Sequence, residues 1–231
     1  MALVTLSGVA CFVVSMVALH WLQPDLNPFD QAMSYYVHGS QGWLLTLGLF
    51  TLGLGSLALT IALASRPGAP TSRGGNWCLG IWSVGALLGA IFSADPPGHW
   101  DRPPSVGGSI HGLAAMVALI VFPFATLLWS RRFRSDPRWA GLSFTPLVLA
   151  AASAASLVAF MLSLVPVFVR PGPPVLLGLT ERILFAIYVS WLVVVAIGLR
   201  RFSVRRIAEP GAAPMHRTTH SPPAPVSGGG R

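Results

Sequence analysis

Six long apolar segments, separated by short polar connections, constrain this chain more than any other feature. They lie at about residues 2–22, 42–64, 76–94, 109–130, 141–169 and 182–199. A helix of roughly 20 apolar residues crosses the hydrocarbon layer of a bilayer, where only helices and closed barrels satisfy every backbone polar group. Only 10% of the residues are charged, against about 25% in soluble domains. The sequence therefore predicts an all-α fold, a polytopic transmembrane bundle of six helices.

The charged residues are divided between alternate connections, and this division predicts the orientation of the bundle. Five of the seven acidic residues lie in one set of connections: Asp25, Asp30, Asp95, Asp101 and Glu181. The other set carries most of the arginines: Arg66, Arg73, Arg131, Arg132, Arg134, Arg138, Arg200, Arg201, Arg205 and Arg206. Arginine-rich loops stay in the cytoplasm. We therefore expect a multi-pass protein of the plasma membrane, the inner membrane of a bacterium, with cytoplasmic N and C termini.

Residues 1–207 form the predicted six-span transmembrane domain. From about residue 208 onward Pro, Gly, Ser and Thr dominate, a composition typical of a disordered segment. We therefore expect residues 208–231 to be a disordered cytoplasmic tail.

The net charge of +8 does not indicate nucleic-acid binding. All fifteen basic residues are arginines near the ends of segments, as expected for the flanks of membrane spans. The predicted partners are the lipid bilayer and, through the cytoplasmic arginines, anionic lipid headgroups. The sequence indicates no protein partner. Trp21, Trp43, Trp100, Trp129 and Trp139 fall near predicted membrane interfaces, where such residues are enriched.

The connection 23–41 is rich in polar residues that are candidates for ligand binding: Asp25, Asn27, Ser34 and Tyr35. Apolar residues recur within it at spacings of three and four, from Leu26 to Val37. This pattern predicts an amphipathic helix on the membrane surface or over the bundle, with Asp25 or Asn27 as its cap. A capped interfacial helix without a binding role explains the pattern equally well.

Asp95 and His111 are the candidate catalytic pair. Asp95 ends the third apolar segment, and His111 lies in the first turn predicted for the fourth. If these helices pack antiparallel, the two side chains meet at the membrane boundary. An aspartate that orients a neutral imidazole suits general-base catalysis or metal binding. Ser109 is a further ligand-binding candidate, and also the expected N-cap of the fourth helix.

Two other residues could join this pair. Glu181 heads the sixth segment beside Arg182 and is either an interfacial anchor or a weaker catalytic candidate. His20 could complete a metal site with His111 and Asp95, for which a divalent metal such as zinc is suitable. The alternative for His20 is a histidine hydrogen-bonded at the headgroup level.

Several of these motifs resemble the membrane family catalogued as domain of unknown function 998. They are Gln23-Pro-Asp-Leu-Asn-Pro28, Ser34-Tyr35, Phe92-Ser-Ala-Asp95-Pro96, Gly108-Ser-Ile-His111-Gly112 and Glu181-Arg182. The resemblance covers about residues 5–200. Family members usually have Phe-Pro before the aspartate, where this chain has Ser93-Ala94. The resemblance implies a six-span bundle and no particular reaction.

Three functions remain open from the sequence, and whether the protein is an enzyme is not decided. The first is a non-catalytic role in the envelope, in membrane assembly or as a sensor. The second is a metal-assisted hydrolase that acts on an outer-leaflet lipid or lipid-linked substrate, and the third is a small transporter component. An open outer pocket lined by Asp95 and His111 favours ligand binding or catalysis. Complete pairing of both side chains without a cavity favours a structural cap.

Overall fold

The computed structural model describes residues 1–65, 71–98, 102–142, 144–169 and 175–208, with side chains for all of these except 167–169 and 202–208. These residues form six α-helices and two short 3-10 helices. In chain order they are α1 (Ala2–Leu22), η1 (Met33–His38), α2 (Trp43–Ala64), α3 (Arg73–Ile91), α4 (Val106–Arg134), η2 (Pro137–Trp139), α5 (Phe144–Val169) and α6 (Leu177–Ala208). All six α-helices are long and apolar enough to cross a membrane. The predicted all-α six-helix architecture is confirmed.

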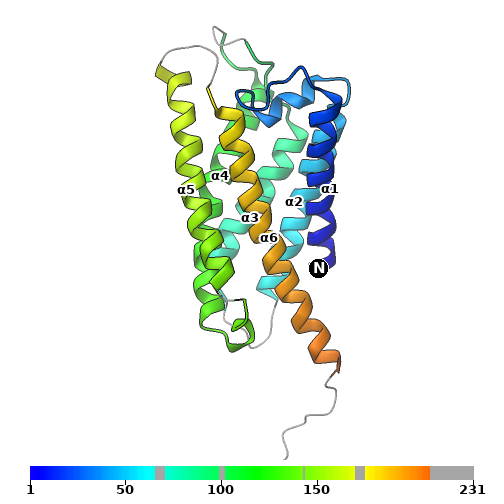
Figure 1. The fold of residues 1–231 in the computed structure, drawn as a ribbon, viewed down its shortest axis with the longest axis vertical. Coiled ribbons are helices and arrows are strands. Elements are labelled where there is room, and N and C mark those ends of the chain that lie inside the picture. The colour runs from blue at the N-terminus through cyan, green and yellow to red at the C-terminus, as the bar shows by residue number, and fades with distance from the viewer. Residues whose placement is uncertain (66–70, 99–101, 143, 170–174, 209–231) are drawn as a thin grey trace, which may run out of the picture.

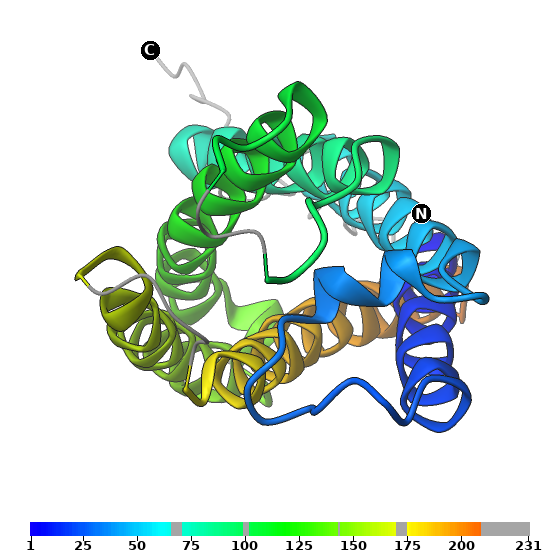
Figure 2. The same ribbon diagram turned by 90° about the horizontal axis from the view of Figure 1, so that it is seen from above.

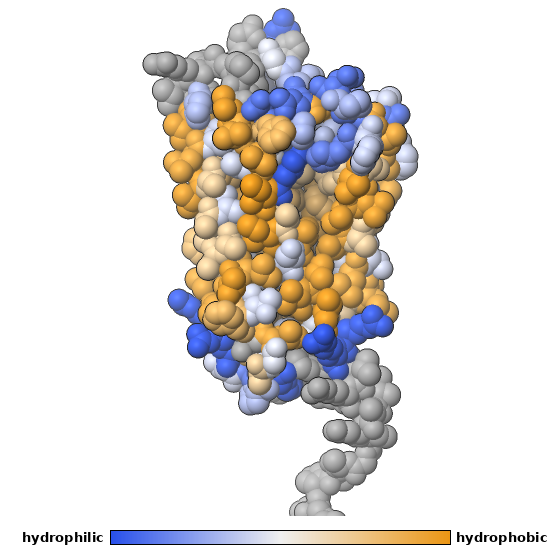
Figure 3. All heavy atoms as spheres, viewed as in Figure 1, coloured by the Kyte–Doolittle hydropathy of each residue, from blue (hydrophilic) through white to orange (hydrophobic). Residues whose placement is uncertain are grey.

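The six α-helices form a closed ring. Each α-helix packs against its neighbours in the chain, and α6 also packs against α1 (Figures 1 and 2). The sides of the bundle are apolar, and hydrophilic residues gather at its two ends (Figure 3). We call one end the acidic end, which carries residues 23–42, 92–105 and 175–176. The opposite, arginine-rich end carries Arg73, Arg131, Arg132, Arg134, Arg138, Arg200 and Arg201.

Small residues allow neighbouring helices to approach closely, as membrane helices require when lipid removes the hydrophobic incentive to associate. A Cβ atom on Gly8 would overlap the carbonyl oxygen of Thr51 on α2. At the same contact, the hydroxyl of Thr5 donates to the carbonyl oxygen of Gly55 at 2.9 Å. On the other side of the ring, a Cβ on Gly85 would lie 3.0 Å from the carbonyl oxygen of Ala114.

Aromatic side chains fill the bundle from its middle to its arginine-rich end. Phe122 stacks on Tyr188 with centroids 4.2 Å apart, and Phe133 stacks on Trp139 at 3.9 Å. Their polar atoms are also paired, since the Tyr188 hydroxyl donates to the Leu119 carbonyl and Trp191 Nε1 donates to the Ser130 hydroxyl. This half of the bundle is therefore solidly packed.

The tryptophans correct one prediction. Trp129 and Trp139 are 2% and 1% exposed and belong to this aromatic core, because both rings stack against Phe133 instead of facing the interface. Trp21 and Trp43 are 82% and 62% exposed, as a membrane interface allows. Trp100 lies outside the described residues.

Helix boundaries at the acidic end differ from the predicted ones. Helix α4 begins at Val106, and its N-cap is Ser105, whose hydroxyl accepts from the Gly108 N–H at 2.9 Å, instead of Ser109. His111 consequently lies in the second turn of α4. Helix α3 ends at Ile91, so Asp95 belongs to the connection beyond it. The predicted amphipathic helix of the first connection is replaced by turns and by η1, because side-chain hydrogen bonds at Asn27 stabilise a turn there.

Candidate functional site

Two pockets meet at the acidic end of the bundle. The outer pocket has a volume of about 730 Å³ and is lined by Tyr35, Asp95, Arg102, Ser105, Ser109 and other residues of the connections. The inner cavity has a volume of about 60 Å³ and an apolar floor that includes Phe12, Trp82, Leu119 and Phe185. Ser34 and His111 line both. We call the polar residues between the two pockets, Ser34, His111 and Glu181, the neck.

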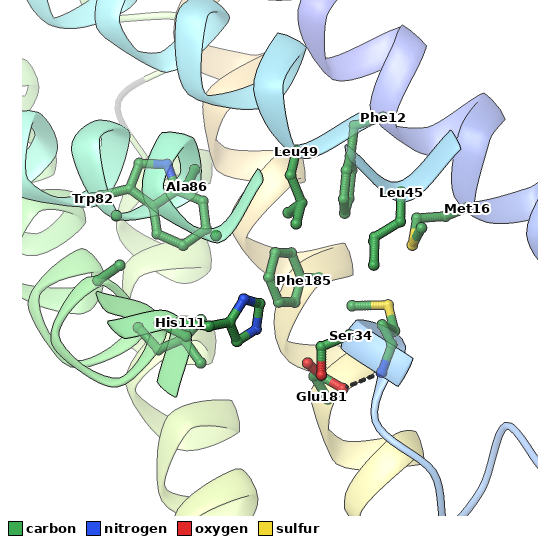
Figure 4. A pocket seen from close by; sticks show the side chains of 16 residues that line it. Phe12, Met16, Ser34, Leu45, Leu49, Trp82, Ala86, His111, Glu181 and Phe185 are labelled. Carbon is green, nitrogen blue, oxygen red and sulfur yellow. Dashed lines mark hydrogen bonds between the residues drawn. The ribbon is translucent and has the colours of Figure 1, made fainter. Parts of the chain in front are cut away.

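Glu181 is a buried carboxylate with spare hydrogen-bonding capacity. It lies in the second turn of α6, is 9% exposed and lines the inner cavity beside Ser34 (Figure 4). One oxygen, Oε2, accepts the backbone N–H of Met33 at 2.7 Å. Within the described part of the chain no group bonds the other oxygen, Oε1. A buried charge is costly unless it is compensated, so this oxygen is suited to a bound partner.

His111 presents a hydrogen-bond acceptor to the same cavity. Its Nδ1 lies 2.8 Å from the carbonyl oxygen of Phe92, and because a carbonyl only accepts, Nδ1 must carry the proton. In the neutral ring Nε2 is then an acceptor, and no described residue bonds it. The imidazole points across the neck toward Glu181 and Ser34 (Figure 4). The Ser34 hydroxyl also lacks a partner among the residues whose side chains are described.

Asp95 organises the start of α4. Its two oxygens accept from the backbone N–H of Ser105 at 2.9 Å and from the Ser105 hydroxyl at 2.5 Å. A Cβ atom at Gly108 would overlap the Asp95 carboxylate, so the close approach requires glycine there. Asp95 and His111 therefore reach the same outer pocket through separate hydrogen bonds, Asp95 to the cap of α4 and His111 to the end of α3.

Arg182 follows Glu181 in sequence but points toward α1 and the first connection. Its Nε donates to His20 Nε2 at 2.8 Å, and one terminal nitrogen donates to the carbonyl oxygens of Gln31 and Gly178 at 3.0 and 2.9 Å. The other donates to the Tyr36 hydroxyl at 3.2 Å. No carboxylate of a described residue lies within ion-pairing distance of this guanidinium. The predicted interfacial anchor is thus Arg182 itself, without Glu181.

His20 is not positioned to share a metal with Asp95 and His111. Besides Arg182, it contacts the Met16 carbonyl oxygen, which lies 2.6 Å from Nδ1. Both ring nitrogens are therefore occupied. Across the described residues, no group of three or more His, Cys, Asp or Glu side chains has an arrangement that could hold a metal ion. Cys11 and Cys78 are free thiols.

The remaining candidates differ in their surroundings. Asn27 Oδ1 accepts the Phe29 N–H at 2.9 Å and closes a turn, while Asp25 is exposed. Ser109 and Tyr35 line the outer pocket. Burial raises the pKa of the Tyr35 phenol above its usual value, and the nearby Glu181 charge raises it further.

Sequence reasoning missed several residues that shape the site. Trp82, Phe185 and the other apolar residues of the floor carry no signal that separates them from ordinary core residues. Gly178 was also missed. A Cβ atom there would lie 2.6 Å from the Pro28 carbonyl oxygen and would overlap that of Gln31, so glycine allows the first connection to pack on α6.

The family model described as "Protein of unknown function (DUF998)" matches residues 6–198, a range that contains all the neck residues. The chain is a DUF998 protein. The family resemblance predicted from the sequence motifs is confirmed. No curated protein and no solved structure matches the chain significantly. Membership of DUF998 brings no known reaction, so the function has to be argued from the pocket.

Proposed function

We propose that this DUF998 protein is a non-catalytic ligand-binding protein, a receptor or sensor, whose pocket takes a small amphiphile from the extracytoplasmic side of the plasma membrane. The observation that carries the proposal is the continuity of the two pockets through the neck. The division of charges supports the orientation, because arginine-rich ends of membrane bundles stay in the cytoplasm. The acidic end, with the open pocket, then faces outward.

The chemistry of the pocket matches an amphiphile. Ligand sites are mostly apolar with a few convergent polar groups, and here an apolar floor lies beneath three polar neck residues. Leaving a buried polar group without a partner costs about 1–3 kcal/mol. A ligand that bonds the free atoms of Glu181, His111 and Ser34 removes this cost, while its apolar part fills the cavity.

The hydrolase and transporter alternatives have weaker support. A hydrolase site built on Asp95 and His111 lacks the orienting contact, because His111 Nδ1 bonds a backbone carbonyl and Asp95 caps α4. Transport requires a route to the arginine-rich end, where buried aromatic residues such as Phe122, Tyr188 and Trp191 fill the bundle. Neither alternative has an observation of its own in its favour.

Native mass spectrometry of the full chain, purified gently from its membrane, tests the proposal. We expect a small amphiphile to copurify with the wild type. Ala115→Leu, which extends a half-buried side chain of the inner cavity, should abolish this adduct. Ala154→Leu is the matched control, because Ala154 is exposed on α5 and lines neither pocket.

Two results contradict the proposal. One is a folded wild type that retains no amphiphile and is not stabilised by added alkyl amines, alcohols or carboxylates. The other is chemical conversion of the bound amphiphile during incubation, which shows that the protein is an enzyme.

A further inference from the structure

We propose that the ligand is an amphiphile with a primary ammonium headgroup, bound with its ammonium at the neck and its apolar chain on the cavity floor. This inference rests on the proposed function and adds the chemical class of the ligand. It starts from the charges around the inner cavity. Glu181 is the only carboxylate among the described lining residues, and neither lysine nor arginine lines this cavity.

The cation nearest in sequence does not neutralise Glu181 directly. The guanidinium of Arg182 is directed to His20, Tyr36 and two backbone carbonyls, and it forms no ion pair with Glu181. Buried charges are normally paired. A bound ammonium supplies the missing partner at Oε1, the oxygen that the Met33 N–H leaves unbonded.

The hydrogen-bonding capacity of the neck points to the same class of headgroup. Glu181 Oε1 and His111 Nε2 are acceptors, and the Ser34 hydroxyl can accept as well as donate. An ammonium carries three N–H donors and no acceptor, so it can satisfy all three side chains at once. A neutral alcohol supplies one donor. A carboxylate headgroup supplies only acceptors and a charge that Glu181 repels.

The cavity floor sets the other end of the ligand. Phe12, Trp82, Leu119 and Phe185 offer apolar contact, and the aromatic faces of the floor also favour a nearby cation. For scale, an engineered apolar cavity of about 150 Å³ binds benzene, so the inner cavity of about 60 Å³ holds only a short alkyl chain. The outer pocket leaves room for substituents on the headgroup.

Calorimetry with three ligands of equal chain length tests this inference: hexylamine hydrochloride, hexanol and sodium hexanoate. The full chain is used in a neutral detergent. We expect hexylamine to bind at least tenfold more tightly than hexanol, and hexanoate not to bind. Glu181→Gln keeps an acceptor for the Met33 N–H but removes the charge. It should abolish the preference for the amine while leaving hexanol affinity within about twofold, because tenfold in affinity corresponds to about 1.4 kcal/mol.

Asp25→Asn is the matched control, because it removes one negative charge from an exposed site at the same end of the bundle. It should leave all three affinities unchanged. If Glu181→Gln does not fold, the amine-to-alcohol ratio of the wild type decides, together with Ser34→Ala, which should weaken the amine severalfold.

The outcomes separate the two proposals. If hexanol binds the wild type as tightly as hexylamine, or if Glu181→Gln keeps the preference, the ammonium inference is wrong and amphiphile binding stands. If none of the three ligands binds, and neither do their shorter and longer homologues, both proposals are wrong.

Discussion

Arg182 and His20 join the last and first helices of the bundle through a hydrogen bond of 2.8 Å from Arg182 Nε to His20 Nε2. A guanidinium only donates, so Nε2 of His20 accepts and the ring proton lies on Nδ1, directed at the Met16 carbonyl oxygen. The same arginine bonds Gln31 and Tyr36 of the first connection. This single side chain therefore closes the ring of helices and fixes the segment that covers Glu181.

Arg182→Lys should destabilise the protein, because a lysine ammonium cannot reproduce the planar fork that reaches His20, Gln31 and Tyr36 together. Loss of two or three of these bonds should cost about 2–4 kcal/mol. In a thermal unfolding assay in detergent, the expected drop in Tm is about 4–12 °C for a chain of this size. Arg201→Lys, at an exposed position of α6, is the control. Equal unfolding temperatures for the two variants would contradict this role for Arg182.

Gly178→Ala should loosen the first connection from α6. The added methyl group would overlap the Gln31 carbonyl oxygen and approach that of Pro28 to 2.6 Å. Both contacts are with backbone atoms, so the segments must separate, at a cost of about 1–3 kcal/mol. Gly80→Ala on α3 is the control, because nothing lies within 4 Å of its Cβ position. Alanine favours the helix by about 1 kcal/mol at such sites.

Limited proteolysis of residues 23–42 checks the prediction for Gly178→Ala independently. Cleavage there should be faster in Gly178→Ala than in Gly80→Ala. An unchanged rate would show that the connection does not depend on this close contact.

The fold was predictable because length and hydrophobicity determine which segments can cross a bilayer. The observed α1 and α2 lie within one residue of the predicted spans. The ends of α3, α4 and α6 were less predictable, because polar and small residues such as Ser105 and Gly178 extend these helices or cap them. The two cytoplasmic termini remain a prediction from the arginines.

The neck was predictable only in part. His111 and Glu181 stood out as ionisable residues next to apolar segments. The directions of their side chains could not be read from the sequence. Consecutive helical residues are about 100° apart around the axis, so Glu181 faces the cavity while Arg182 faces α1. Nor could the sequence show that Asp95 bonds Ser105, because this contact depends on how tightly the connection between α3 and α4 folds back.

Asp95→Asn should lower stability through the cap of α4. The asparagine side chain has one acceptor oxygen instead of two, so it cannot accept from both the N–H and the hydroxyl of Ser105. The expected cost is about 1–2 kcal/mol, typical of a lost cap. Asp25→Asn, at an exposed position, should have no such effect. If added zinc stabilises the wild type but not Asp95→Asn, Asp95 is a metal ligand and the structural role is wrong.

Tyr35 should titrate at a higher pH than an ordinary tyrosine, because burial and then the Glu181 charge raise its pKa in the folded state. The unfolded value is about 10, so between the two values the folded state holds more protons and stability falls as pH rises. This contribution is complete below about pH 10 and is lost as pH rises through the folded pKa. The sequence has three tyrosines and no lysine, which keeps the alkaline range simple.

The phenolate absorbance of detergent-purified protein in the near ultraviolet measures this titration. Subtracting the curve of Tyr35→Phe from that of the wild type isolates Tyr35, whose midpoint should lie above that of free tyrosine. Glu181→Gln should move the midpoint part of the way down, because it removes the charge but leaves the burial. Tyr35→Phe should also make the fall of Tm with alkaline pH shallower. A Tyr35 midpoint at the free value, unmoved by Glu181→Gln, would show that the phenol is solvated and that the neck is more open than the structure has it.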